Sequence, residues 1–234
     1  MGSSRGARRP RIDAATRERV TAAPNRSGTK GAATQTRLLD SALAVFGREG
    51  HAGFTVHAVV AESGVSLGSL YHHFGSFHGL ASALYARCMA DLLDALIARI
   101  EHARTARGGV TAVVEGYLAH AVENPIPMRF IYASSYATYL PEHAATIAAI
   151  KGPRLEVLGR FLHNHVEKGR IVVLPEPLYE MLIIGPVSEV CERWLAGDAR
   201  YDLAIAGKYL PERIWRSIRA PHQTRLSSKP SHGP

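Results

Sequence analysis

Apolar residues recur along the chain at intervals of three and four, the spacing of amphipathic helices, and the second half shows no strand-like alternation. The most informative segment covers residues 55–74. Its first part places Val56, Val59 and Val60 on one helical face directly after Thr55, a residue type that caps helix N-termini. We therefore predict a short helix that begins after Thr55.

A tight turn and a second short helix follow. Gly64 supplies the permissive backbone that a sharp turn needs, and Val65 is expected to plug the turn. Ser66 can cap the next helix, whose inner face holds Leu70 and Phe74. The outer face is left with Leu67, Ser69, Tyr71, His72 and His73. This geometry suits the entry of a small polar helix into the major groove of DNA.

Helical patterns flank this pair. Upstream, apolar residues recur at Leu38, Leu39, Ala42, Val45 and Phe46; downstream, Ser76 can cap a long helix that runs to Ile100. Taken together, residues 37–84 resemble the DNA-binding domain of the TetR family of bacterial transcriptional regulators. The matching residues are Leu38, Leu39, Ala42, Phe46, Gly50, Thr55, Val59, Gly64, Val65, Ser66, Gly68, Ser69, Leu70, Tyr71, His73, Phe74, Ser76 and Leu80.

The sequence departs from the family pattern at two places. Val60 stands where the family usually has alanine, and Phe77-His78 stands where Lys-Glu is usual. The resemblance implies an all-α fold: an N-terminal three-helix helix-turn-helix domain, then a C-terminal helical domain for ligand binding and dimerisation. It also implies contact with an operator through Arg37, Thr55, Ser66, Leu67, Gly68, Ser69, Tyr71, His72 and His73.

The net charge of +8 is concentrated at the N-terminus. Residues 1–37 hold nine Lys or Arg against Asp13 and Glu18, which gives +7, whereas 19 basic and 18 acidic residues follow. We predict a disordered basic arm over residues 1–31, which either neutralises DNA phosphates or is a solvated tail. The remaining predicted boundaries are 32–84 for the DNA-binding domain (recognition helix about 66–74), 85–220 for the helical domain and 221–234 for a flexible tail.

The predicted helix-turn-helix itself carries little positive charge. Between residues 38 and 86 the only Lys or Arg is Arg48. Contact with DNA would then depend on helix N-termini, hydroxyls and histidines. His57, His72, His73 and His78 fall on or beside the expected contact surface, so we predict stronger binding to the operator at lower pH.

Other composition features favour a cytoplasmic protein, and the resemblance implies a bacterial, nucleoid-associated one. No apolar run approaches the roughly 18 residues that a membrane span needs, and no hydrophobic segment follows the arginine-rich start. Cys88 and Cys191 lie far apart in helical patterns, which is typical of free thiols in a reducing compartment. A redox switch between them is the alternative.

The second half predicts further helices, broken by proline and glycine. A bend is expected at Gly152-Pro153, a kink at Gly185-Pro186 and an interruption near Pro211. The expected ranges are 110–122, 127–140, 142–168, 178–195 and 201–219.

By resemblance, the last two helices pair with those of a second copy in a four-helix bundle. The expected interface residues are Leu182, Val190, Trp194, Leu210, Ile214 and Ile218. The alternative is that the same residues form an ordinary intramolecular core. A homodimer suits a palindromic operator, because two recognition helices must reach half-sites about 34 Å apart.

A ligand site is suggested by Tyr132, Tyr136 and Tyr139, which share one helical face. Met128 lies near them in the sequence, and Leu158 and Phe161 on the following helix can form the opposite wall. Buried phenols need polar partners, which favours a cavity with polar content, although an aromatic stripe is also common in plain cores. The pattern does not choose among a lipid, an aromatic molecule and an acyl thioester.

The resulting hypothesis is a dimeric transcriptional regulator that a small molecule releases from its operator, and we expect a repressor. The alternative is a DNA-binding or architectural factor without a small-molecule effector. Catalysis is not expected, because the sequence lacks a phosphate-binding glycine loop and a nucleophile elbow. His163 and His165 are two residues apart and point to different sides of a helix, so neither a metal nor a cofactor is expected.

Overall fold

The computed structural model describes residues 26–134 and 141–221, and in these ranges the chain is all-α, as predicted. Its only other regular pairing there is an isolated antiparallel bridge between Ile171 and Arg219. Among the described helices, none has the length and apolar content needed to span a membrane. The elements are α1 (Arg26–Gly53), α2 (Val56–Ser63), α3 (Leu67–Phe74), α4 (Phe77–Ile100), α5 (Ala106–Glu123), α6 (Pro125–Ser134), the short 3₁₀ helix η2 (Pro141–His143), α7 (Ala144–Glu167), α8 (Glu176–Ile183), α9 (Gly185–Leu195) and α10 (Leu203–Ile218).

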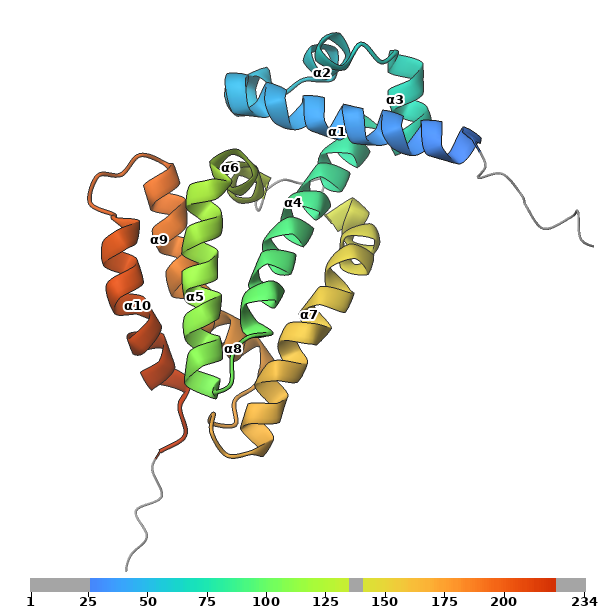
Figure 1. Ribbon diagram of the computed structural model, residues 1–234. Coiled ribbons are helices and arrows are strands. Elements are labelled where there is room, and N and C mark those ends of the chain that lie inside the picture. The colour runs from blue at the N-terminus through green and yellow to red at the C-terminus, as the bar shows by residue number, and fades with distance from the viewer. Residues whose placement is uncertain (1–25, 135–140, 222–234) are drawn as a thin grey trace, which may run out of the picture.

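Helices α1, α2 and α3 form a small head at one end of the molecule (Figure 1). The predicted caps are confirmed: the Thr55 hydroxyl accepts a hydrogen bond from the Ala58 amide at 3.3 Å, and Ser66 does the same for Ser69 at 3.2 Å. Gly64 ends α2 with φ 62°, a left-handed conformation that favours glycine. The turn between α2 and α3 therefore follows directly from the local sequence.

Helix α4 joins the head to the rest of the molecule. Ser76 caps it through a 2.9 Å bond from the Gly79 amide, and Leu80 and Leu84 are fully buried in the head's core. Farther along, Leu92 and Leu96 are buried in the larger domain. The boundary predicted at residue 84 thus falls inside one continuous helix, so movement of the lower part of α4 reaches the head through a rigid element.

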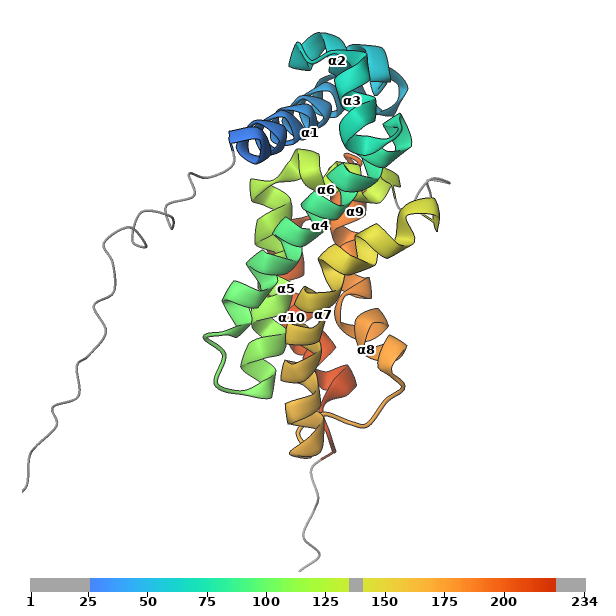
Figure 2. The ribbon, with the colours of Figure 1, turned by 90° about the vertical axis from the view of Figure 1, so that its right-hand side faces the viewer.

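The larger domain surrounds the lower part of α4 (Figures 1 and 2). Helices α5 and α7 pack against α4, and α10 packs against α5 and α9. The end of α10 is fixed to the loop after α7, because the Val172 amide donates to the Ile218 carbonyl at 2.9 Å. The Ala220 amide likewise donates to the Arg170 carbonyl at 3.0 Å.

Several predicted boundaries differ from the structure. Helix α1 begins at Arg26, so residues 26–31 of the expected arm are helical. At the expected kink at Gly185-Pro186, only Ile184 separates α8 from α9. Ile184 keeps right-handed helical φ and ψ, and its carbonyl accepts from the Ser188 amide at 2.8 Å.

Pro153 and Pro211 lie inside α7 and α10, where a bend and an interruption were expected. A proline removes one helical hydrogen bond, but both halves of each helix remain packed on neighbours, and Pro211 itself is buried. Tertiary packing therefore keeps these two helices continuous.

Candidate DNA-reading face and effector cavity

The outer face of α3 is open to solvent. Tyr71 is 43% exposed and Leu67 37%, His72 is exposed, and Ser69 and His73 are half-buried. On the inner side Leu70 is fully buried and fixes the rotation of the helix. The residues expected to read DNA on this helix therefore share one accessible surface.

Gly68 occupies the first turn of α3 without a structural requirement for glycine. A Cβ atom built there would meet nothing within 4 Å, and its φ is not positive. The protein itself would accept a side chain at this position. A partner that approaches the backbone closely would not, because the added methyl group would stand between them.

The caps of α2 and α3 also bear on anion binding. The Thr55 and Ser66 hydroxyls each satisfy one amide, and the first amides of a helix have no intrahelical acceptor. Such amides, together with the helix dipole, favour phosphate oxygens. Arg37, the remaining expected contact, lies exposed on α1 rather than on the helix-turn-helix pair.

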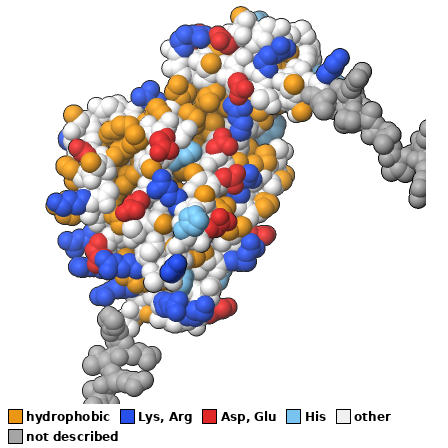
Figure 3. Space-filling view, in the orientation of Figure 1, with side chains coloured by type: hydrophobic (Ala, Val, Ile, Leu, Met, Phe, Trp, Pro, Cys, Tyr) orange, Lys and Arg blue, Asp and Glu red, His pale blue; other side chains and the backbone are white. Residues whose placement is uncertain are grey.

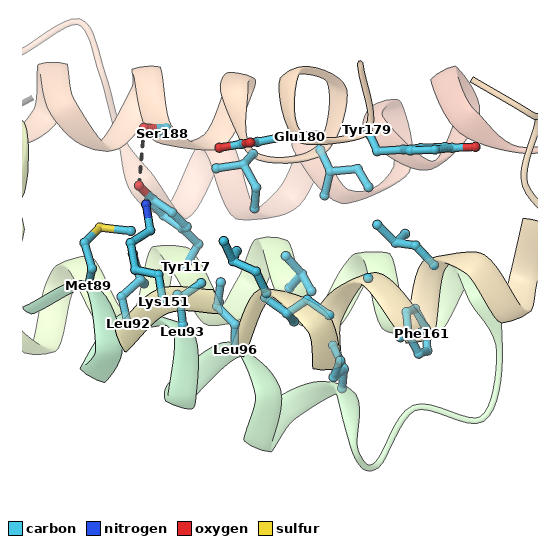
Figure 4. A pocket seen from close by; sticks show the side chains of 18 of the residues that line it. Met89, Leu92, Leu93, Leu96, Tyr117, Lys151, Phe161, Tyr179, Glu180 and Ser188 are labelled. Carbon is cyan, nitrogen blue, oxygen red and sulfur yellow. Dashed lines mark hydrogen bonds between the residues drawn. The ribbon is translucent and has the colours of Figure 1, made fainter. Parts of the chain in front are cut away.

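The larger domain contains a cavity of about 760 Å³. It is bounded by α4, α5, α6, α7, α8 and α9, and Figure 4 shows many of its walls. Its lining is mostly aliphatic and aromatic: Tyr85, Met89, Leu92, Leu93, Leu96, Ile100, Val110, Val113, Tyr117, Ile131, Tyr132, Leu155, Leu158, Phe161, Leu162, Tyr179, Ile183 and Ile184.

Of the predicted ligand contacts, Tyr132, Leu158 and Phe161 line the cavity. Met128 does not: it is completely buried in the core. Its position on α6 is three residues before the lining residue Ile131, and it packs into the protein instead. Tyr136 and Tyr139 lie outside the described residues.

The cavity is elongated along α4. Its lining on that helix runs from Tyr85 to Ile100, and 15 residues at 1.5 Å rise span about 22 Å. At one end the Phe161 ring packs over Gly109, where an added Cβ would collide with the ring. The shape therefore fits a long, slender apolar molecule better than a compact one.

Three hydroxyls form a polar cluster in the wall. The Tyr132 hydroxyl donates to the Ser188 carbonyl at 3.1 Å and lies 3.0 Å from the Tyr117 hydroxyl, which donates to the Ser188 hydroxyl at 3.3 Å (Figure 4). Burial raises the pKa of both phenols, so they stay neutral. They can donate to or accept from a ligand without adding charge.

Charged side chains also reach the cavity. Lys151 comes from α7, and Glu176, Glu180 and Glu192 come from α8 and α9. Within the described parts of the chain none of the four forms an ion pair. These side chains can therefore interact with the polar end of a bound molecule, while the remaining lining holds its apolar part.

Sequence reasoning missed most of this lining. Val110, Val113 and Tyr117 recur at intervals of three and four, so their sharing of one face of the expected helix 110–122 could have been predicted. No sequence pattern marks Ser188 or Lys151 as a lining residue, since their position depends on helices that meet only in the folded chain. His163 touches the cavity, whereas His165 is buried against the Phe161 ring at 4.6 Å between ring centroids, so the two histidines do point apart.

Two of the expected interface residues lie in the core of the single chain. Ile214 and Ile218 are 3% and 0% exposed in the single chain, because this side of α10 packs on α5. Leu182, Val190, Trp194 and Leu210 are half-buried at the edge of the same core. The outer face of α10 instead exposes Ile205 and Tyr209, at 59% and 55%.

Comparisons with known proteins agree with this architecture. Residues 38–84 match the sequence profile described as "Bacterial regulatory proteins, tetR family". The chain is 24% identical to the HTH-type transcriptional repressor BepR of Brucella suis over 82% of this chain and 96% of BepR.

Among solved structures, a putative TetR family regulator from Shewanella sp. PV-4 superposes with a TM-score of 0.67 at 18% identity, covering 80% of this chain and 99% of that one. The transcriptional regulator FadR of Bacillus subtilis, solved in complex with stearoyl-CoA, gives 0.65 at 20% identity, covering 78% and 98%. Residues 38–84 are therefore a DNA-binding domain of the TetR family, and over most of its length the chain is similar to transcriptional regulators of that family.

Proposed function

We propose that this protein is a dimeric repressor that an elongated, mainly apolar small molecule releases from its operator. The observation that carries the proposal is the cavity of about 760 Å³, whose wall along α4 belongs to the helix that also completes the head. A regulator without a small-molecule effector has no need for such a space. The open cavity therefore favours a sensor over the effector-free alternative.

The operator would be read by α3. Ser69, Tyr71 and His72 are the expected contacts to bases or phosphates, with the first turns of α2 and α3 facing the backbone. Leu67 and Gly68 allow close approach, and His73 borders the same face.

The route from the cavity to the head follows α4 and α6. Ile131 and Tyr132 of α6 line the cavity, and the adjacent Phe130 packs against Phe46 at 4.9 Å and Phe54 at 5.5 Å between ring centroids. A ligand that displaces α6 or the lower part of α4 would therefore shift the head. For release, the ligand must bind the DNA-incompetent arrangement more tightly than the competent one.

The relative FadR of Bacillus subtilis was solved with stearoyl-CoA, which makes long acyl chains the first ligand class to test here. The length of the cavity, about 22 Å along α4, suits an acyl chain of about 16 carbons. The hydroxyls of Tyr117, Tyr132 and Ser188 and the ammonium group of Lys151 would then meet polar groups of the ligand.

Pairing of two copies would use the outer sides of α8, α9 and α10. Exposed apolar side chains there include Leu178, Met181, Ile205 and Tyr209, which extend the half-buried edge at Leu182, Val190, Trp194 and Leu210. Ile205→Glu with Tyr209→Glu is expected to convert the dimer to a monomer in light scattering coupled to size exclusion. A wild-type monomer would contradict the pairing.

The ligand test is a fluorescence-anisotropy titration on the DNA upstream of the protein's own gene, repeated with palmitoyl-CoA, palmitate and a panel of metabolites. Gly159→Leu is the matched variant, because Gly159 lines the cavity and an added Cβ there meets nothing within 4 Å. The variant should keep DNA binding and lose release. If no compound releases the wild type, or if the variant responds equally, the cavity is not the effector site.

A further inference from the structure

The cavity ends at an aromatic side chain on the side away from its hydroxyl cluster. In Figure 4, Phe161 and Tyr179 lie toward one end of the lining, whereas Tyr117, Ser188 and Lys151 lie toward the other. A long molecule that directs its polar group to the hydroxyls therefore directs its apolar end to the Phe161 ring.

The Phe161 side chain reaches across this end of the cavity from α7 to α5. A Cβ atom built on Gly109 of α5 would collide with Cζ of Phe161, which is the tip of the ring. Gly109 is buried in its helix, and its φ is not positive, so the backbone itself does not require glycine there. What requires glycine is the ring, whose tip rests on the α5 backbone.

The ring is also held from its own helix. His165, one turn after Phe161 on α7, is buried, and the two rings make a T-shaped contact with 4.6 Å between their centroids. The Arg170 guanidinium donates to Nδ1 of His165 at 3.3 Å, which fixes the imidazole in turn. Phe161 is therefore confined between the α5 backbone and a positioned neighbour.

Tyr179 forms a second fixed part of this end, from α8. Its hydroxyl donates to the Val172 carbonyl and accepts from the Leu174 amide, both at 2.9 Å, so the phenol is held by the backbone before α8. The Tyr179 ring is buried and lines the cavity. The end wall thus consists of two aromatic rings that are both held in place.

The outer surface at this end of the domain is charged. Arg104 and Arg107 stand just before Gly109, and Lys168 and Arg170 follow α7; all four are exposed. Figure 3 shows Lys and Arg side chains gathered over the lower end of the larger domain. A hydrocarbon chain that passed the ring would therefore leave the apolar lining for a polar, hydrated surface.

We propose that Phe161 sets the maximal chain length of the effector, and that Gly109 permits this by admitting the tip of the ring. Each methylene that is withdrawn from water strengthens binding by about fourfold, so affinity rises with chain length until the methyl end meets the ring. A longer chain must leave methylenes in water or displace a packed ring. The proposal rests on the proposed function, since it requires an effector with an alkyl chain.

The experiment measures dissociation constants of saturated fatty acids from about 8 to about 20 carbons on the full chain, by isothermal titration calorimetry. In the wild type the rise in affinity should stop at or below about 16 carbons, the length that fits the cavity. Phe161→Ala should move this stop to chains about four carbons longer, because the ring is removed and its neighbours close in only partly. Phe161→Leu, a milder change, should move it in the same direction by less.

Gly109→Ala should move the stop in the opposite direction. The added methyl group displaces the ring tip, and His165 occupies one side of the ring, so the ring must turn into the cavity. We expect the stop at chains about two carbons shorter. Opposite shifts from substitutions on two different helices are not produced by a general loss of packing.

Leu158→Ala is the matched control. Leu158 also lines the cavity from α7, three residues before Phe161, and forms part of the side wall. Its removal should weaken binding of every chain that reaches it and leave the stop where it is. Melting curves followed by circular dichroism check that all variants are folded.

The outcomes separate the two proposals. Absence of binding by any fatty acid in the wild type would overturn the alkyl-chain effector of the proposed function, and the role of Phe161 with it. Binding that stops at the same length in the wild type and in both Phe161 variants would overturn only the role of Phe161. An equal shift in Leu158→Ala would overturn it as well, since any enlargement of the cavity would then suffice.

Discussion

The head and the cavity domain are built from the same kind of element but are specified in different ways. In the head, local signals start three successive helices: Thr55, Ser66 and Ser76 cap α2, α3 and α4, and Gly64 makes the left-handed turn between α2 and α3. In the larger domain the functional feature is a space, and its walls come from residues between Tyr85 and Glu192. No local stretch of sequence describes that space.

The two regions also differ in what their buried side chains border. Leu38, Ala42, Val45, Val59 and Leu70 are all completely buried in the head. In the larger domain, apolar side chains such as Leu92, Leu96 and Ile183 are buried from water yet border an open cavity. A reading head must hold one geometry, whereas a sensor must leave room for its ligand.

The largest expected effect concerns the packed joint between these regions. Phe130→Ala should destabilise the protein by about 3–5 kcal/mol, because the ring is 2% exposed and packs against Phe46 and Phe54. Phe161→Ala is the control: that ring already borders the cavity, so we expect roughly half the loss or less. Urea denaturation followed by circular dichroism measures both. Equal losses would show that the cavity wall is packed as tightly as the joint.

The sequence predicts more of the head than of the larger domain. The caps, the Gly64 turn, the buried Val65 and the exposed face of α3 were all readable, since each depends on residues within about four positions. The continuity of α10 through Pro211 was not, because packing against α5 and α9 decides it. Periodicity likewise shows that the helix face with Ile214 and Ile218 is apolar. It does not show whether that face is covered by the same chain or by a second copy.

The next largest effect concerns Gly68, in the first turn of α3. Gly68→Ala should leave the fold intact or stabilise α3 by up to about 1 kcal/mol, since alanine is the better helix former and the Cβ has open space. Operator affinity should nevertheless fall by about tenfold, or about 1.4 kcal/mol, if DNA approaches the backbone closely. Melting curves and anisotropy titrations measure the two quantities. Unchanged affinity would place Gly68 outside the contact surface.

A smaller effect is expected from the histidines of the head. His57, His72 and His78 are exposed and His73 is half-buried, so their imidazoles can reach phosphate oxygens. His72→Gln with His73→Gln should therefore weaken operator binding, by up to about fivefold for each histidine that meets a phosphate. Anisotropy titrations at constant salt measure the affinity. Unchanged affinity would remove these two histidines from the phosphate contacts.

The smallest effect belongs to the larger domain and concerns pH. His120 of α5 is 7% exposed, its Nε2 has no hydrogen-bond partner among the described residues, and its Nδ1 lies 3.4 Å from the Asn124 amide nitrogen. Burial lowers the pKa of this imidazole, although the nearby carboxylates of Asp91 and Glu123 act against the shift. The unfolded chain therefore binds this proton more readily than the folded one, so stability is complete above about pH 6.5 and decreases below it. We expect the melting temperature to fall by a few degrees from pH 7.5 to pH 5.5, with a smaller fall in His120→Gln. An identical fall in the variant would assign the acid sensitivity to other groups, of which His165 is the first to test, because burial lowers its pKa as well.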